Sequence, residues 1–267
     1  MNSAALKIRK YYTVFTTSFQ NQLIYRADLF AQNIFYALLL FIFINLWSKV
    51  FSAREFISGY TKNDLIWYFI ITEIITLSTQ SFYHNISAQI KGGNFAYSLN
   101  KPYGFLMYSF WENSGVIIYK LVTNSVIGIV MGSVFAGMLN MNALVHAPLI
   151  LITVISGIML HFLIQTCIAL TALYVEDNIA FFWIYNKLVL IFGIMIPIDM
   201  FPGWLYDIVK YMPFSFVTFG PAKLVLNFSL DYFLHVLAWQ SIYILMAGLA
   251  SIIIFKKGVR KVSIHGG

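Results

Sequence analysis

One face of a predicted helix carries polar side chains at steps of three and four residues: Glu73, Thr76, Gln80 and His84. This spacing gathers them into one helical stripe within an otherwise apolar stretch. Ionisable groups inside a membrane-spanning helix are costly, and they usually face a bundle interior or a water-filled cavity. Two interpretations are open: the stripe lines a substrate path, or it forms hydrogen bonds to a neighbouring helix.

Two further polar pairs lie in apolar stretches. His161 and Gln165 share one helical face, and Lys120 and Asn124 share another. For both pairs the sequence favours hydrogen bonds between helices.

The sequence lacks the motifs of common catalytic sites. It contains no GxxxxGK[ST] phosphate loop, no HExxH zinc motif and no GxSxG nucleophile elbow. The five histidines are scattered, and the single cysteine, Cys167, rules out a disulfide framework or a cysteine-based metal cluster. We therefore expect no catalytic residue, no metal site and no cofactor on this chain, and we expect that it is not an enzyme.

The composition indicates that lipid is the solvent for much of this chain. Of its 267 residues, 60% are hydrophobic and 10% are charged, whereas soluble domains carry about 25% charged residues. A span needs roughly 20 mainly apolar residues. Six stretches meet this requirement: Leu29–Val50, Leu65–Ser87, Ser114–Met138, Pro148–Val175, Asn178–Ile198 and Phe233–Phe255. The expected fold is an all-α integral membrane domain of six transmembrane helices over residues 1–267.

The positions of the basic residues predict the orientation of the chain, because Lys and Arg concentrate in cytoplasmic loops. With the N-terminus inside, the cytoplasmic segments hold ten of the 17 basic residues and the external segments hold five. The remaining two, Lys120 and Lys187, lie within spans. This imbalance favours both termini in the cytoplasm, including a basic tail over residues 256–267.

Residues 1–28 precede the first span and are too polar to cross. Apolar residues at steps of three and four mark one helical face there: Ile8, Tyr12, Phe15, Phe19 and Leu23. We expect an amphipathic helix at the cytoplasmic membrane interface, with nearby basic residues facing lipid headgroups. The alternative is an ordinary start to a longer first helix.

Residues 88–112 link spans 2 and 3 on the expected cytoplasmic side. Gly92-Gly93 breaks any helix and Lys101-Pro102 marks a second boundary. Between them, Asn94 to Leu99 has room for one or two helical turns. This segment either receives force from a partner protein or is a plain interfacial turn.

Residues 197–232 hold four of the six prolines in an aromatic and aliphatic setting: Pro197, Pro202, Pro213 and Pro221. Proline breaks a helix, and irregular backbone at membrane depth persists only when it is buried in protein or faces a water-filled cavity. We expect broken, re-entrant helices on the external side. The alternative is an amphipathic external loop.

Three stretches resemble the permease subunits of type-2 ABC exporters, specifically their compact six-span subfamily: QLIYRADLFAQNIFYALL, IKGGNFAYSLNKPYG and FKKGVRKVSIHGG. The likeness covers essentially the whole chain in order and spacing. In the second stretch members commonly carry Arg before the Pro, where this chain has Lys101, so a cation is kept.

The resemblance implies two functional segments. The coupling element that docks on a nucleotide-binding subunit comprises Gln89, Lys91, Gly92, Gly93, Asn94, Phe95, Ser98, Leu99, Lys101 and Pro102. The external gate comprises Pro197, Phe201, Pro202, Pro213 and Pro221.

The resemblance also implies the partners and the activity. They are soluble ATPase subunits that bind ATP and Mg, a second permease subunit (identical or related) and membrane lipids, with no nucleic acid. The complex moves an amphipathic drug, peptide or lipid out of the cytoplasm or inner leaflet, in the cell membrane of a prokaryote. Alternatives are an ATPase-independent scaffold or lipid-modifying enzyme, and a secondary transporter coupled to protons through Glu73 or His84.

Overall fold

The computed structural model describes residues 3–24, 26–79, 82–99, 103–139 and 141–265, and this part of the chain is helical without a β-strand. The longer helices are α1 (Ser3–Ile24), α2 (Arg26–Val50), α3 (Lys62–Thr79), α4 (Phe82–Lys91), α6 (Phe105–Ala136), α8 (Ala147–Leu170), α9 (Ile179–Val189) and α12 (Leu230–His265). The shorter ones are α5 (Asn94–Leu99), α7 (Met141–Val145), α10 (Gly203–Val209) and α11 (Gly220–Leu226).

Five helical stretches are long and apolar enough to cross a membrane: Phe30–Val50, Lys62–Lys91, Phe105–Ala136, Ala147–Leu173 and Leu230–Arg260. They confirm an all-α membrane protein. The expected fifth span, Asn178–Ile198, is a shorter apolar helix over Ile179–Met195. It ends there because a π-helical turn at Leu190–Met195 gives way to extended backbone at Ile196, before Pro197.

Two helix boundaries differ from the expected ones. Helix α6 begins at Phe105 rather than Ser114, so it takes up the last part of the 88–112 linker. Helix α12 continues to His265, so the basic residues that follow the sixth span extend a helix rather than form a separate tail. The added part of α6 contains no Gly or Pro, and α12 continues through Gly258, where a Cβ would lie 2.5 Å from Leu173 Cδ1.

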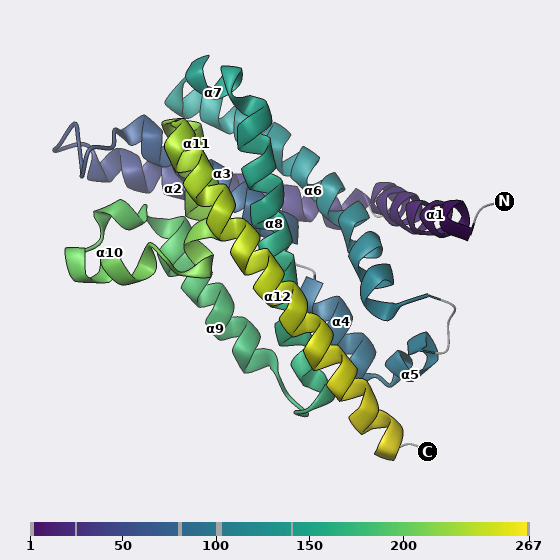
Figure 1. Ribbon diagram of the computed structural model, residues 1–267. Helices are drawn as coiled ribbons and strands as arrows, with labels where there is room; N and C mark the ends of the chain where they lie inside the picture. The colour runs from purple at the N-terminus through teal and green to yellow at the C-terminus, as the bar shows by residue number, and fades with distance from the viewer. Residues whose placement is uncertain (1–2, 25, 80–81, 100–102, 140, 266–267) are drawn as a thin grey trace.

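Helix α8 runs through the middle of the bundle, and α12 lies along it (Figure 1). Helices α3 and α6 form a second close pair, which depends on two glycines. A Cβ on Gly132 would lie 2.5 Å from the Trp67 ring, and one on Gly128 would lie 2.7 Å from Ile70 Cγ2. Two small residues four positions apart therefore let these helix backbones approach closely.

The connecting segments gather at opposite ends of the bundle. The α2–α3 connection, α7 and α10 lie at one end, and α5, the α8–α9 turn and the C-terminus lie at the other (Figure 1). We call these the α10 end and the α5 end.

Helix α1 packs against α6. The Ser18 hydroxyl donates a 2.6 Å hydrogen bond to the Glu112 carbonyl, and Gly115 lets the α1 backbone pass close to α6. On the predicted apolar face, Phe19 meets Tyr119 edge to face at 5.8 Å, whereas Ile8 and Tyr12 are exposed. The apolar face is therefore only partly covered by the protein.

The chain between α9 and α12 is a series of broken helices, as expected from its prolines. Pro202 precedes α10, and Pro221 lies in the first turn of α11, which continues directly from the π-helical turn Ser215–Phe219. The π-helical turn Ser215–Phe219 is fully buried. Gln240 of α12 holds it by donating 2.9 Å hydrogen bonds to the Phe216 and Thr153 carbonyls. The irregular backbone of this turn is thus buried within the protein, which is the condition for such backbone at membrane depth.

Candidate functional site

A cavity of about 580 Å³ lies among α2, α3, α4, α6, α8 and α9. Apolar side chains share its walls with these charged and polar ones: Gln32, Glu73, Thr76, His84, Lys120, His161, Asn186 and Lys187. Ligand sites in proteins have this size and combine apolar lining with polar groups that orient the ligand. The cavity is therefore a candidate binding site within the membrane domain.

Three members of the polar stripe lie on the cavity wall: Glu73, Thr76 and His84. Gln80 lies outside the described residues. Ser87, one step further along the same face, instead bonds to Asn178 with its hydroxyl 3.1 Å from the Asn178 Oδ1. The side chains of Glu73, Thr76 and His84 therefore face the cavity, whereas Ser87 on the same helical face connects α4 to the start of α9.

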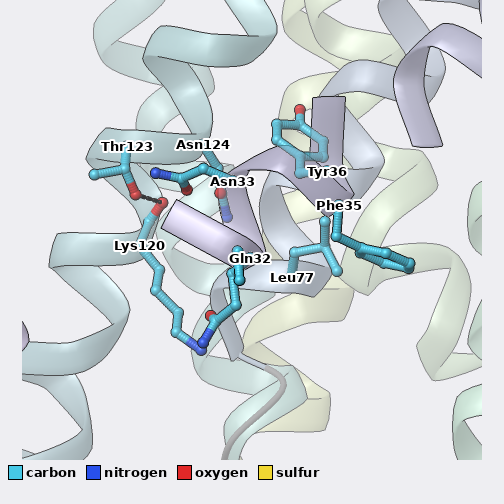
Figure 2. Close-up of a pocket in the computed structure, with 9 residues that line it drawn as sticks. Gln32, Asn33, Phe35, Tyr36, Leu77, Lys120, Thr123 and Asn124 are labelled. Carbon is cyan, nitrogen blue, oxygen red and sulfur yellow. Dashed lines mark hydrogen bonds between the residues drawn. The ribbon is translucent and has the colours of Figure 1, made fainter. Parts of the chain in front are cut away.

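A smaller cavity of about 290 Å³ adjoins the first and shares Gln32, Phe35, Leu77 and Lys120 with it. Figure 2 shows the Lys120 side chain extending toward the side chain of Gln32, from α6 toward α2. Asn33, Thr123 and Asn124 also line this recess. Polar groups from two helices therefore surround a single lysine.

The two other polar pairs form hydrogen bonds between helices, as the sequence predicted. His161 of α8 bonds through Nδ1 to the Tyr185 hydroxyl of α9 at 2.7 Å, and Gln165 contacts its other ring nitrogen at 2.8 Å. The Asn124 amide donates to Ser78 of α3 at 3.4 Å. Lys120 is the exception within these pairs, since it lines both cavities.

The segment after α4 has the Gly-Gly break and short helix that the sequence predicts. Gly93 has φ +75°, and α5 follows directly. Phe95 is 3% exposed and packs edge to face on Phe105 and Phe255, at 5.0 and 6.0 Å. Tyr97 is 75% exposed on the opposite side of α5. One side of this short helix is anchored and the other faces outward.

The remaining residues of the expected coupling element divide by exposure. Gln89 and Leu99 are half-buried, and Gly92 and Gly93 are exposed. The side chains of Asn94 and Ser98 are not described, and Lys101 and Pro102 lie outside the described residues. Tyr97 was not singled out from the sequence, because an exposed aromatic residue there matches no motif.

Asn178, at the turn between α8 and α9, is a structural hub that the sequence did not reveal. Its side chain is 0% exposed and accepts hydrogen bonds from Tyr83 and Ser87 of α4, at 2.7 and 3.1 Å. Its amide donates to the Ile168 and Ala169 carbonyls of α8, at 3.0 and 3.2 Å. An Asn at a helix start is the one local signal in the sequence, and it lies at the edge of the expected span Asn178–Ile198.

An ion pair reinforces this hub at the surface. Lys91 Nζ lies 3.0 Å from Asp177 Oδ1. Its hydrogen bond, with a further one from the Ile179 N–H, holds the pKa of Asp177 below its usual value. The end of α4, next to Gly92-Gly93, is thereby tied to the start of α9.

The expected gate residues lie at the α10 end. Pro197 and Pro221 are buried, Phe201 and Pro213 are half-buried, and Pro202 is exposed. Asp199 connects this region to the α2–α3 loop, since it accepts hydrogen bonds from Tyr60 at 2.8 Å and from Lys223 at 2.6 Å. A further link joins the two π-helical turns to α3: the Gly193 carbonyl accepts hydrogen bonds from Tyr68 and Thr218, at 2.7 and 2.8 Å.

Long apolar helices surround a cavity with polar and charged side chains, and broken helices lie at one end of the bundle, an arrangement that fits a membrane-embedded permease domain. Residues 34–266 match the family model described as "ABC-2 family transporter protein". The chain therefore belongs to the ABC-2 family and is a permease of an ABC transporter, as the resemblance predicted. A search of curated proteins finds no match. Family membership implies in general that an ATPase works with this chain.

Proposed function

We propose that this chain is the permease subunit of an exporter driven by separate ATPase subunits, which hold the ATP and Mg. It pairs with a second permease subunit and moves an amphipathic substrate out of the cytoplasm or inner leaflet. The observation that carries the proposal is the geometry of α4, which lines the cavity through His84 and ends at the Gly-Gly break before α5.

This arrangement supports transmission of force between the ATPase and the cavity. Phe95 anchors α5 on α6 and α12, while Tyr97 is available for contact with a partner. The ring of Tyr83 stacks on Phe182, which lines the cavity, at 4.2 Å. A displacement of α5 therefore moves cavity-lining side chains of both α4 and α9.

The basic residues support a cytoplasmic α5 end. Lys91 precedes α5, and Lys256, Lys257 and Arg260 lie on the last turns of α12 at the same end. Basic residues are typical of cytoplasmic segments. With this orientation both termini lie in the cytoplasm, and the broken helices between α9 and α12 lie on the external side of the membrane.

Co-purification with a soluble ATPase carrying a phosphate-loop motif, followed by an ATP-hydrolysis assay in proteoliposomes, tests the proposal. We expect a stable complex whose ATP hydrolysis rises with an amphipathic substrate. A chain that processes lipid without any ATPase would contradict the proposal and support the lipid-modifying alternative.

A second candidate function is proton-coupled transport, because Glu73 and His84 line the same cavity. Transport that a protonophore abolishes and that ATP leaves unchanged would favour this candidate. Transport that requires ATP and survives the protonophore would exclude it.

A further inference from the structure

The inference starts from Lys120, in the middle of the 32-residue helix α6. Its side chain is half-buried and lines both cavities. Within the described part of the chain, the ion pairs are Lys91–Asp177, Lys210–Asp207 and Lys223–Asp199, and none includes Lys120. An ammonium group held in an apolar bundle is costly without an anionic partner.

The smaller cavity around Lys120 is suited to an anionic group. Its other polar side chains are those of Gln32, Asn33, Tyr36, Thr123 and Asn124. The three amides can donate N–H groups to oxygen, whereas the Thr123 hydroxyl already donates to the backbone of α6. The described residues that line this recess include no acidic one. Glu73 lies on the wall of the larger cavity only, and it forms no ion pair with Lys120.

The apolar part of the larger cavity is suited to an apolar body next to that group, although the cavity is also lined by Glu73, Thr76, His84, His161, Asn186 and Lys187. Phe35 and Leu77 line both spaces, and Leu39, Trp183 and Leu190 continue the apolar wall. Phe35 and Trp183 are more than half exposed, so apolar surface extends from the cavity to the outside of the bundle. A molecule with a charged head and an apolar tail matches both spaces at once.

We propose that these joined cavities bind an anionic amphiphile, whose carboxylate or phosphate head pairs with Lys120 in the smaller cavity. The apolar tail lies in the larger cavity against Phe35, Leu77 and Trp183. Binding of the amphiphile is argued from the two cavities alone. That the bound amphiphile is also the exported substrate rests on the proposed function.

Binding to the full-length chain in nanodiscs of zwitterionic lipid tests this inference. The probes share one chain length and are radiolabelled dodecanoate, dodecyl phosphate, dodecanol and dodecylamine, with empty nanodiscs subtracted. We expect one or both anions to bind more tightly than dodecanol and dodecylamine, and the two anionic probes distinguish a carboxylate head from a phosphate head. Tighter binding of dodecylamine, or no preference among the four, overturns the proposal.

Variants at Lys120 test whether this side chain causes the preference for anionic probes. Lys120→Gln is expected to weaken anion binding by about tenfold or more and to leave dodecanol unchanged, and Lys120→Arg is expected to retain the preference. Lys49→Gln, at the exposed end of α2, is the matched control. Gln32→Glu provides a second test, because a carboxylate facing Lys120 competes with the anionic head. Unchanged anion binding in both Lys120→Gln and Gln32→Glu overturns the inference.

ATP hydrolysis by the reconstituted complex separates this inference from the proposed function. Stimulation by dodecylamine alone leaves the exporter intact and refutes the anionic cargo. Anion binding that depends on Lys120, in a chain that associates with no ATPase, supports the site and refutes the exporter.

Discussion

The Tyr60 hydroxyl donates a 2.8 Å hydrogen bond to the Asp199 carboxylate, which also pairs with Lys223 at 2.6 Å. These three residues come from the α2–α3 loop, the turn before α10, and α11. One carboxylate thus joins three segments at the α10 end. Burial, together with this hydrogen bond to Asp199, raises the pKa of Tyr60, so its hydroxyl keeps the proton at physiological pH.

Asp199→Asn should destabilise this end of the protein. The substitution leaves the partly buried Lys223 ammonium without its carboxylate, at an expected cost of about 1–3 kcal/mol in unfolding free energy. Thermal unfolding in detergent measures the effect. Asp207→Asn is the control, because its pair with Lys210 is more exposed and should be worth less than about 1 kcal/mol. Equal losses in both variants would argue against a structural role specific to Asp199.

Asn178→Ala should both destabilise the protein and weaken coupling. It leaves the buried Tyr83 hydroxyl without its acceptor, at an expected cost of about 2–4 kcal/mol. Unfolding and substrate-stimulated ATP hydrolysis are the two measurements. The control is Asn45→Ala, which removes only an exposed bond within α2. Full stimulation in Asn178→Ala would show that the hub is structural only.

Gly93→Pro should abolish substrate-stimulated ATP hydrolysis without preventing membrane insertion. Gly93 has φ +75°, whereas proline is fixed near −65°, so the break before α5 must change shape. The matched control is Gly137→Pro, since Gly137 has φ +78° and open space around it near the α10 end. Normal stimulation in Gly93→Pro and in Leu99→Asp would refute the coupling role.

Gly132→Ala should push α3 and α6 apart. The added methyl group would lie 2.5 Å from the Trp67 ring, and overpacking of this kind costs about 1–3 kcal/mol. Gly248→Ala in α12 is the control, because its nearest atom would be 3.9 Å away. Unfolding midpoints of both variants provide the comparison, and a loss confined to Gly248→Ala would contradict the prediction.

Acid should loosen the tie between α4 and α9. Lys91 lowers the pKa of Asp177 in the folded chain. The stability that this pair adds to the folded state is therefore present above the unfolded pKa of about 4 and is lost as the pH falls through the lowered pKa. Hydrogen exchange in α4 should therefore be faster in Asp177→Asn than in wild type at pH 6. The two proteins should converge in acid, and a difference that persists there would contradict this account.

The sequence predicts those parts of the structure that depend on local patterns. Helical spacing placed Glu73, Thr76 and His84 on one face, and proline positions indicated the broken helices between α9 and α12. It did not reveal how far α6 and α12 extend, because the apolar run that defines a span does not mark where its helix begins or ends.

Tertiary contacts explain what the sequence could not predict. Asn178 is important because α4 supplies two hydroxyls far away in sequence, and no spacing within α9 encodes them. The π-helical turn at Leu190–Met195 is stabilised by Tyr68 and Thr218, which bond to the Gly193 carbonyl. Lys120 was grouped with Asn124 as a helix contact, yet only the packing of α2 against α6 makes it part of a cavity.

The contact between Phe255 of α12 and Phe95 of α5 has a practical consequence for experiments. A fluorescent protein or affinity tag fused after α12 begins close to the surface where an ATPase is proposed to dock. Such a fusion is expected to compete with complex assembly, even when the permease folds and reaches the membrane normally. A short epitope inserted in the α2–α3 connection avoids this interference, because it lies at the α10 end of the bundle.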